Sequence, residues 1–199
     1  WFIGVSRIRE KLVYLNSHIN WIPKSTGDKR FSNWLSTAND WNLSRSRYWG
    51  IPLPIWRTID KSETKVIGSI KELKNEIELS LENRHMNFDP LEDFEIENMS
   101  NENYDKIDLH KDTADKIILS SPKGKPMYRE KDLIDVWFDS GAMPYAQVHY
   151  PFENKDFIDK KKLFPADYIA EGVDQTRGWF YTLHVISAIV FDSISYKNV

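Results

Sequence analysis

DYIAEGVDQTRGWFYTLHVISAIVF, residues 167–191, decides the fold class that we expect for this chain. Asp167–Ala170 favours a short strand, and the acidic, glycine-containing stretch Glu171–Asp174 favours a loop. From Gln175 to Phe191, apolar residues recur at helical spacing, which predicts a buried helix; they are Trp179, Leu183, Ile186 and Val190. A strand, a loop and a helix in this order place ligands at the carboxyl ends of strands in doubly wound α/β folds. The sequence therefore predicts an α/β fold.

The loop between this strand and helix carries groups that suit a nucleotide. Carboxylates at Glu171 and Asp174 can accept hydrogen bonds from ribose hydroxyls, and Gly172 lets a ligand approach the backbone closely. A helix that begins at Gln175 offers free N–H groups to an anion or a carbonyl oxygen. Alternatively, Asp174 is a helix N-cap and Glu171 a solvated loop residue. Spacing alone does not decide between these interpretations.

DVWFDSG, residues 135–141, is a second candidate for the site. We expect a short strand that runs into a turn at Gly141. Trp137 could then wall an apolar pocket, while Asp135 or Asp139 orders the turn. The alternative is a core tryptophan between two turn-forming aspartates, and for this motif taken alone the alternative is the better interpretation.

WNLSRSRYWGIPLPIWR, residues 41–57, combines aromatic residues with arginines. Its two prolines exclude a helix and predict an extended segment. Arg45, Arg47 and Trp49 resemble a patch in which guanidinium groups meet phosphates and aromatic rings meet bases. A pair of surface arginines beside a packed aromatic cluster would have the same composition.

The remaining segments predict smaller elements. Upstream, we expect a helix from about Ser6 to Ser17 capped by Ser6, a strand at Trp21–Pro23, a polar turn at Lys24–Arg30 and a helix at Phe31–Ala38. A shift to Asn, Glu and Lys from about Asp60 to Lys125 predicts a protruding insertion, with one amphipathic helix near residues 70–74 and a strand at 117–119. We expect this insertion to be less buried than residues 131–199.

Composition excludes several classes of protein. Of the 199 residues, 41% are hydrophobic, which suffices for a core and argues against disorder. The formal net charge of −3 is unlike that of a dedicated nucleic-acid-binding module, which is normally basic. The chain has no cysteine, which excludes disulfides and thiolate zinc sites, and its five histidines show no metal-ligand spacing. No apolar run reaches transmembrane length.

Taken together, the three motifs resemble the region of isoleucyl-tRNA synthetases that follows the editing insertion. The first motif is similar in the valyl and leucyl enzymes, whereas DVWFDSG and the Asp-Gln-x-Arg-Gly-Trp-Phe form of the last motif point to isoleucine. The resemblance is weakest from about Leu79 to Asp108. It implies a return segment from the editing insertion (1–40), a catalytic-core segment (41–59), a polar connective insertion (60–130) and the adenylate-pocket half of a class I Rossmann-like domain (131–199).

The resemblance also implies an activity and roles for residues. Such enzymes activate isoleucine with ATP and magnesium to isoleucyl-adenylate and transfer the acyl group to the 3′ end of tRNA(Ile), in the cytoplasm. The implied roles are adenylate binding by Glu171, Gly172, Asp174 and Gln175, an isoleucine pocket between Trp137 and Trp179, and contact with the tRNA acceptor end or support of the pocket by Arg45, Arg47 and Trp49. A pocket of this kind rejects valine by one methylene, worth roughly 1–3 kcal/mol, so the full-length enzyme is expected to edit mischarged valine.

Two motifs that define the class, of the His-Ile-Gly-His and Lys-Met-Ser-Lys-Ser types, do not occur in the chain. Together with a start at Trp1 and an end at Val199, their absence predicts an internal segment of a longer enzyme. We expect this segment to be inactive by itself and to hold neither a catalytic residue nor a metal site. The alternative is a stand-alone nucleotide- or tRNA-binding module derived from a synthetase.

Overall fold

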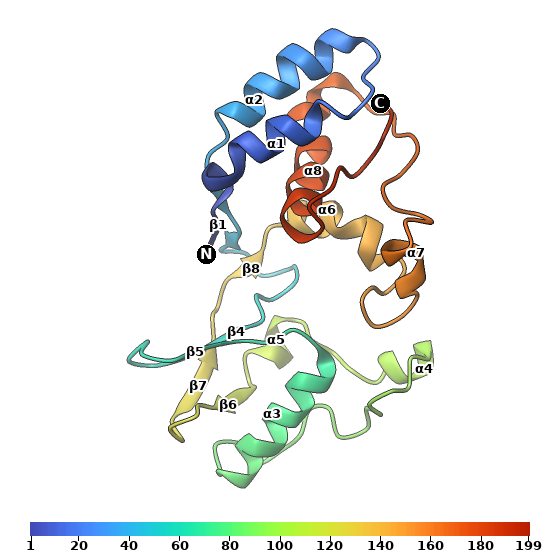
Figure 1. Ribbon diagram of the computed structural model, residues 1–199. Helices are drawn as coiled ribbons and strands as arrows, with labels where there is room; N and C mark the ends of the chain where they lie inside the picture. The colour runs from blue at the N-terminus through green and yellow to red at the C-terminus, as the bar shows by residue number, and fades with distance from the viewer. The chain divides into compact units, whose positions relative to one another are not determined.

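A computed structural model describes residues 1–199, which divide into two compact units. Unit 1 comprises Trp1–Leu43 and Asp135–Val199, and unit 2 comprises Ser44–Ile134. Both units combine helices with strands, so the mixed α/β composition that the sequence predicts is confirmed (Figure 1). Unit 2 also includes residues 44–59, which the sequence assigned to the catalytic core.

Unit 1 is built mainly from helices. Its elements are β1 (Phe2–Ile3), the 3₁₀-helix η1 (Val5–Ile8), α1 (Arg9–Asn16), the π-helix η2 (Thr26–Phe31), α2 (Ser32–Ser36), β2 (Trp41–Asn42), α6 (Val136–Ala146), α7 (Lys155–Asp159), the 3₁₀-helix η3 (Val173–Arg177) and α8 (Trp179–Val190). Strands β1 and β2 pair antiparallel. Helix α8 is buried along most of its length and packs against α1 and α6. It therefore forms the centre of unit 1.

Three extended segments of unit 1 lie side by side in parallel. Residues 195–199 lie between residues 166–169 and residues 20–22, and backbone hydrogen bonds with N···O distances of 2.8 to 3.0 Å join them to both neighbours. Helix α8 connects residues 166–169 to residues 195–199. The predicted strand, loop and helix thus continue into a parallel neighbour, which is the connectivity of a βαβ unit.

The regular strands predicted at Trp21–Pro23 and Asp167–Ala170 are wrong in detail. Neither segment forms a regular strand, and a single parallel bridge lies one residue before each of them, between Asn20 and Asn198 and between Ala166 and Tyr196. The predicted polar turn at Lys24–Arg30 is also wrong, because most of that stretch is helical and leads into α2.

Gly27 explains the second of these errors. A Cβ atom at Gly27 would lie 2.1 Å from Cδ1 of Trp21, so the glycine is needed for close packing of the indole ring. The same indole donates a hydrogen bond to Asn16 Oδ1 (2.9 Å), and the amide of Asn16 donates to the Gly27 carbonyl (3.0 Å). A glycine that the sequence suggested for a turn thus serves a tertiary contact instead.

The strand predicted at DVWFDSG is a helix, α6. Asp135 caps it by accepting a hydrogen bond from the Trp137 N–H (3.3 Å), so an aspartate that suggested a turn is an N-cap. Gly141 lies where α6 meets α8, and a Cβ there would come within 2.9 Å of Ile186. This close contact between two helices, rather than a turn, explains the glycine.

The helix predicted at Ser6–Ser17 is confirmed as η1 followed by α1, but Ser6 does not cap it. Its N–H instead donates to Asp40 Oδ1 (2.9 Å). The helix predicted from Gln175 becomes regular only at Trp179, after the 3₁₀ turn of η3. Val190, expected on the buried face, is 61% exposed at the end of α8.

His184 lies in the core of unit 1, where α8 meets α1. Its Nε2 is 2.9 Å from the Leu12 carbonyl oxygen, and since a carbonyl can only accept, Nε2 carries the proton. Nδ1 is buried without a hydrogen-bond partner. Burial lowers the pKa of His184 from 6.5 to about 4, so this side chain is neutral in the folded protein near neutral pH.

We expect the opening free energy of α8 to fall as the pH falls from about 6.5 to about 4. Between these pH values His184 binds a proton in the unfolded chain but not in the folded chain, so stability rises with pH. The stabilisation is fully present above about pH 6.5 and is lost below about pH 4. The pKa difference corresponds to a loss of up to about 3 kcal/mol. Hydrogen exchange of α8 peptides, corrected for the intrinsic pH dependence, measures it. His184→Gln can keep the bond to Leu12 and should flatten the dependence; an unchanged dependence would contradict this assignment.

Unit 2 contains a four-stranded antiparallel sheet of order β5-β4-β7-β6, against which α3 packs. A second, two-stranded sheet pairs β3 with β8. The elements are β3 (Ser44–Arg45), β4 (Ile55–Thr58), β5 (Thr64–Val66), α3 (Ile70–Glu82), α4 (Asn101–Tyr104), α5 (Lys111–Ala114), β6 (Ile118–Ser120), β7 (Pro126–Arg129) and β8 (Leu133–Ile134). The predicted helix near residues 70–74, the strand near 117–119 and the extended segment 41–57 are all present.

Residues 60–125 are less buried than residues 131–199, as expected, but only slightly, and they are not a loosely packed protrusion. They supply most of a hydrophobic core of their own, which includes Leu73, Ile77, Leu91, Ile117 and Leu119. About a fifth of residues 60–125 are buried, against about a quarter of residues 131–199. The segment is therefore an ordinary folded part of unit 2.

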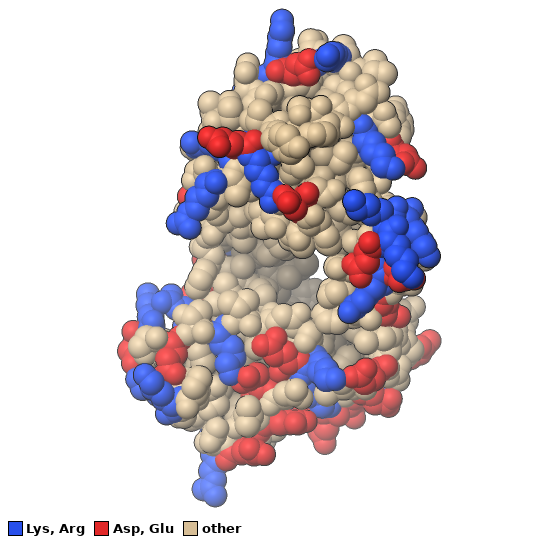
Figure 2. Space-filling model, viewed as in Figure 1, with Lys and Arg blue, Asp and Glu red and all other residues tan.

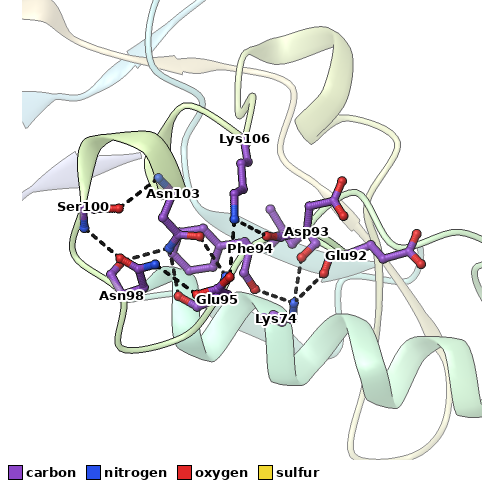
Figure 3. Close-up of polar contacts among 10 residues, drawn as sticks. Lys74, Glu92, Asp93, Phe94, Glu95, Asn98, Ser100, Asn103 and Lys106 are labelled. Atoms are coloured by element: carbon purple, nitrogen blue, oxygen red, sulfur yellow. Dashed lines mark hydrogen bonds and ion pairs between the residues drawn. The ribbon is translucent and has the colours of Figure 1, made fainter.

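The Asn- and Glu-rich stretch of unit 2 is held by polar groups (Figure 3). The buried Asn103 side chain donates to the carbonyls of Glu95 (2.9 Å) and Asn98 (2.8 Å) and accepts from the Glu95 N–H (3.0 Å). Lys74, on α3, donates to the carbonyls of Leu91 and Phe94, both at 2.7 Å. Because these side chains satisfy backbone groups that no sheet or helix satisfies, a polar composition here indicates an ordered loop.

Candidate functional site

The loop from Glu171 to Gly178 begins at the carboxyl end of the extended segment 166–169 and leads into α8. Glu171, Gly172 and Asp174 are exposed on it. A Cβ atom at Gly172 would lie 2.4 Å from Oδ1 of Asp174, so the glycine leaves room for this carboxylate close to the backbone. The loop thus presents carboxylate groups at the strand end where α/β folds bind ligands.

Gln175 connects this loop to α8. Its Oε1 accepts a hydrogen bond from the Trp179 N–H (2.8 Å), and its Nε2 donates to Asp174 Oδ2 (3.1 Å). Gln175, rather than Asp174, therefore satisfies the first free N–H of the helix, and the alternative in which Asp174 is the cap is wrong. The same amide orients the exposed Asp174 carboxylate.

Trp137 and Trp179 both lie beside Gly178. The Trp179 indole N–H donates to the Ser140 carbonyl on α6 (2.9 Å), which fixes the ring between the two helices. Cη2 of Trp137 would lie 3.4 Å from a Cβ atom at Gly178, and the Trp137 side chain remains 42% exposed. The structure therefore brings Gln175 and both tryptophans together around this glycine, whereas no hydrogen bond joins Glu171 to them.

The two aspartates of the second motif differ in their surroundings. Asp135 is buried, and its Oδ2 accepts a hydrogen bond from the Trp41 indole N–H (2.9 Å), a contact that the sequence did not suggest. Asp139 is partly buried, and burial together with the nearby Asp135 charge raises the pKa of its carboxyl. Asp135 thus orders the start of α6. The alternative of a core tryptophan between two turn-forming aspartates is wrong, because Trp137 is 42% exposed and Asp135 caps a helix.

The three residues proposed to meet tRNA lie in unit 2, apart in the chain from the loop of unit 1. Trp49 is 74% exposed, with Tyr48 at 5.0 Å and His110 at 6.2 Å between ring centroids, both edge-on. The Tyr48 hydroxyl donates to Asp112 Oδ2 (2.6 Å). Arg45 lies on β3, and Arg47 is exposed between β3 and Trp49. The aromatic cluster is therefore a surface feature rather than a packed core.

Neither the charge distribution nor clusters of metal ligands give a further indication of the site. Side chains of both signs are intermingled over the face shown in Figure 2, in keeping with the net charge of −3. The chain has no group of three or more His, Cys, Asp or Glu side chains that could hold a metal ion, and no helix long and apolar enough to cross a membrane.

The sequence suggested a class I synthetase catalytic domain from the extended segment 166–169, the loop after it and the tryptophans that lie near the starts of α6 and α8. The model of the class I tRNA synthetase family for isoleucine, leucine, methionine and valine matches residues 1–199, so the chain belongs to this family.

The relatives of the chain include isoleucine–tRNA ligases. The chain is 61% identical to the isoleucine–tRNA ligase of Bacteroides fragilis and 59% identical to the isoleucine–tRNA ligase of Bacteroides thetaiotaomicron, each over 201 aligned residues and 100% of the chain. The cytoplasmic enzyme of Schizosaccharomyces pombe is 44% identical over 200 residues. The chain spans 18%, 17% and 16% of the lengths of these three proteins.

Proposed function

We propose that the full-length protein carrying this chain is a cytoplasmic isoleucine–tRNA ligase. It converts isoleucine and magnesium-bound ATP to isoleucyl-adenylate and pyrophosphate, and then transfers the isoleucyl group to the 3′ end of tRNA(Ile). The observation that carries the proposal is the convergence of Gln175, Trp137 and Trp179 around Gly178, after the carboxyl end of a parallel segment, with Asp174 held by a hydrogen bond from Gln175. The isoleucine-specific relatives supply the choice of amino acid.

In this proposal, the exposed loop binds the adenylate. The Asp174 and Glu171 carboxylates accept hydrogen bonds from ribose hydroxyls, and Gly172 allows the ribose to approach the backbone. Gln175 holds Asp174 in place and lies next to the aminoacyl group. Its amide uses one N–H for Asp174 and one lone pair for the Trp179 N–H, so a second N–H and a second lone pair are available to a ligand.

The two tryptophans bind the amino-acid side chain. A branched aliphatic group needs a dry slot with aromatic walls, and Trp137 and Trp179 both lie beside the loop's last glycine. Such a slot distinguishes isoleucine from valine by a single methylene, so we propose that the full-length enzyme removes mischarged valine elsewhere.

The remaining parts support this pocket. We propose that residues 131–199, with the return segment 1–40, form one half of a Rossmann-like domain, and that residues 60–130 are a connective insertion entered through residues 41–59. Arg45 and Arg47 suit phosphates of the tRNA acceptor end, and the exposed Trp49 ring suits stacking on a base.

Isoleucine-dependent exchange of pyrophosphate into ATP by the full-length protein tests the function. We expect exchange without tRNA, with a kcat/KM for valine roughly 10- to 200-fold lower than for isoleucine. The same protein should also attach isoleucine to tRNA(Ile), and no charging should occur without the protein or without isoleucine. Binding of tRNA without any amino-acid-dependent exchange would instead favour a stand-alone binding module.

A further inference from the structure

The buried hydroxyl of Thr176 lies at the centre of the candidate adenylate loop. The Thr176 side chain is fully buried, one residue after Gln175. Its hydroxyl donates to the Val173 carbonyl (2.8 Å), which closes the 3₁₀ turn of η3, and accepts a hydrogen bond from Nε of Arg30 (3.0 Å). A charged donor thus supports the turn from η2, an element 146 residues away in the chain.

A second contact joins the same two elements. The Arg177 guanidinium lies over the Trp34 ring, 4.9 Å from its centroid, and the Trp34 ring also meets Tyr181 edge-on at 5.8 Å. Arg30 and Trp34 are four residues apart on the continuous helical stretch η2–α2, so they lie on the same face of it. This face therefore contacts the loop at both neighbouring residues, Thr176 and Arg177.

We propose that Arg30 is a positioning residue for the adenylate-binding loop. This inference rests on the proposed function. Arg30 acts through Thr176: its bond fixes the turn that carries Asp174 and Gln175, and Gln175 in turn orients Asp174 and caps α8. Arg30 donates through Nε to a protein hydroxyl, so its effect on catalysis passes through the geometry of the loop. Small displacements of substrate-binding groups lower rates steeply.

Steady-state pyrophosphate exchange by full-length variants tests the proposal, with rates normalised to active sites titrated by adenylate formation. We expect Thr176→Val and Arg30→Met each to raise the KM values for isoleucine and ATP by about tenfold. This factor corresponds to the lower end of the free energy of a hydrogen bond to a charged group. Thr176→Ser keeps the hydroxyl and should stay within about twofold of the original enzyme. The double variant should be no worse than the more affected single variant, because both changes remove the same bond.

Lys29→Met is the matched control, since Lys29 is the exposed neighbour of Arg30 and should leave both KM values unchanged. Arg30 is itself exposed, so Arg30→Met can be tested even if Thr176→Val folds poorly. Unchanged KM values in Arg30→Met, with only lower thermal stability, would overturn the positioning role. An original enzyme without isoleucine-dependent exchange would instead overturn the proposed function, so the two failures are distinguishable.

Discussion

Replacing Trp179 by Ala in the full-length enzyme is expected to raise the KM for isoleucine by about a hundredfold and the KM for ATP far less. Trp179 is held between α8 and α6 by its bond to the Ser140 carbonyl, and with Trp137 it flanks the last glycine of the loop. Truncation of an aromatic residue in a binding pocket costs about 2–4 kcal/mol, which corresponds to a factor of about 30 to 1,000. Discrimination against valine should fall as well, because it depends on contacts to one methylene. Pyrophosphate exchange with both amino acids at several ATP concentrations measures all three effects.

Trp179→Phe is the control for this prediction. It keeps an aromatic wall but loses the indole N–H bond to Ser140, so it should lower stability while changing the isoleucine KM by less than about tenfold. An unchanged isoleucine KM in Trp179→Ala, accompanied by reduced stability, would show that Trp179 is a core residue and would remove it from the pocket.

The largest effect on stability is expected in unit 2, at Arg129. Its side chain is 1% exposed, its Nε donates to Asp115 Oδ1 (2.8 Å), and its Nη1 donates to the carbonyls of Leu53 (3.3 Å) and Asp132 (3.1 Å). Arg129→Ala removes a charge pair in which Arg129 is buried and Asp115 is 33% exposed, and it leaves carbonyl groups without donors. Loss of one partner from a fully buried pair costs about 3–5 kcal/mol. Because water partly solvates Asp115, unit 2 should open more readily by somewhat less than this amount.

Hydrogen exchange of peptides from β4, β7 and α3 in the full-length protein measures this loss. Exchange of α8 in unit 1 should change little, and Lys131→Ala, two residues away and exposed, should be close to neutral. Arg129→Met, which fills the site with an apolar side chain, should cost less than Arg129→Ala. Protection in unit 2 that is unaffected by Arg129→Ala would contradict the account of its core.

Local patterns in the sequence predicted those elements whose form depends on nearby residues. Helical spacing of apolar residues predicted α1 and α3, the latter capped by the Ser69 side chain, which accepts from the Glu72 N–H (3.0 Å). The prolines after Gly50 predicted the extended entry to β4. The composition of Pro122–Lys125 predicted a turn, and a turn follows β6 there, with Gly124 at a φ of +72°.

The errors arise where a residue serves a packing or capping contact instead of a turn. Gly27 and Gly141 suggested turns, but each lets a large side chain or a helix come close. Asp135 suggested a turn, but it caps α6 and accepts from Trp41, 94 residues away. A single sequence shows the residue type at such positions without the partner that gives it its role.

For the candidate site too, local patterns indicated some residues and missed others. Asp174 and Gln175 were accessible to sequence reasoning because a loop of this type follows a strand and precedes a helix. That Gln175 rather than Asp174 caps α8 depends on the start of the helix at Trp179, a boundary that periodicity does not define closely. Arg30 gave no local signal, because its partner Thr176 lies 146 residues away.

The most direct test of the adenylate site is the affinity of the full-length protein for a non-hydrolysable sulfamoyl analogue of isoleucyl-adenylate, measured by calorimetry with and without the ribose 2′- and 3′-hydroxyls. If Asp174 accepts a hydrogen bond from the ribose, Asp174→Asn should weaken binding of the complete analogue by about 10- to 100-fold. Removal of the hydroxyl that Asp174 binds should weaken binding to the original protein by a similar factor, with little further effect in the variant. Equal affinities of the original protein and Asp174→Asn for the complete analogue would contradict the assignment of this loop to the adenylate.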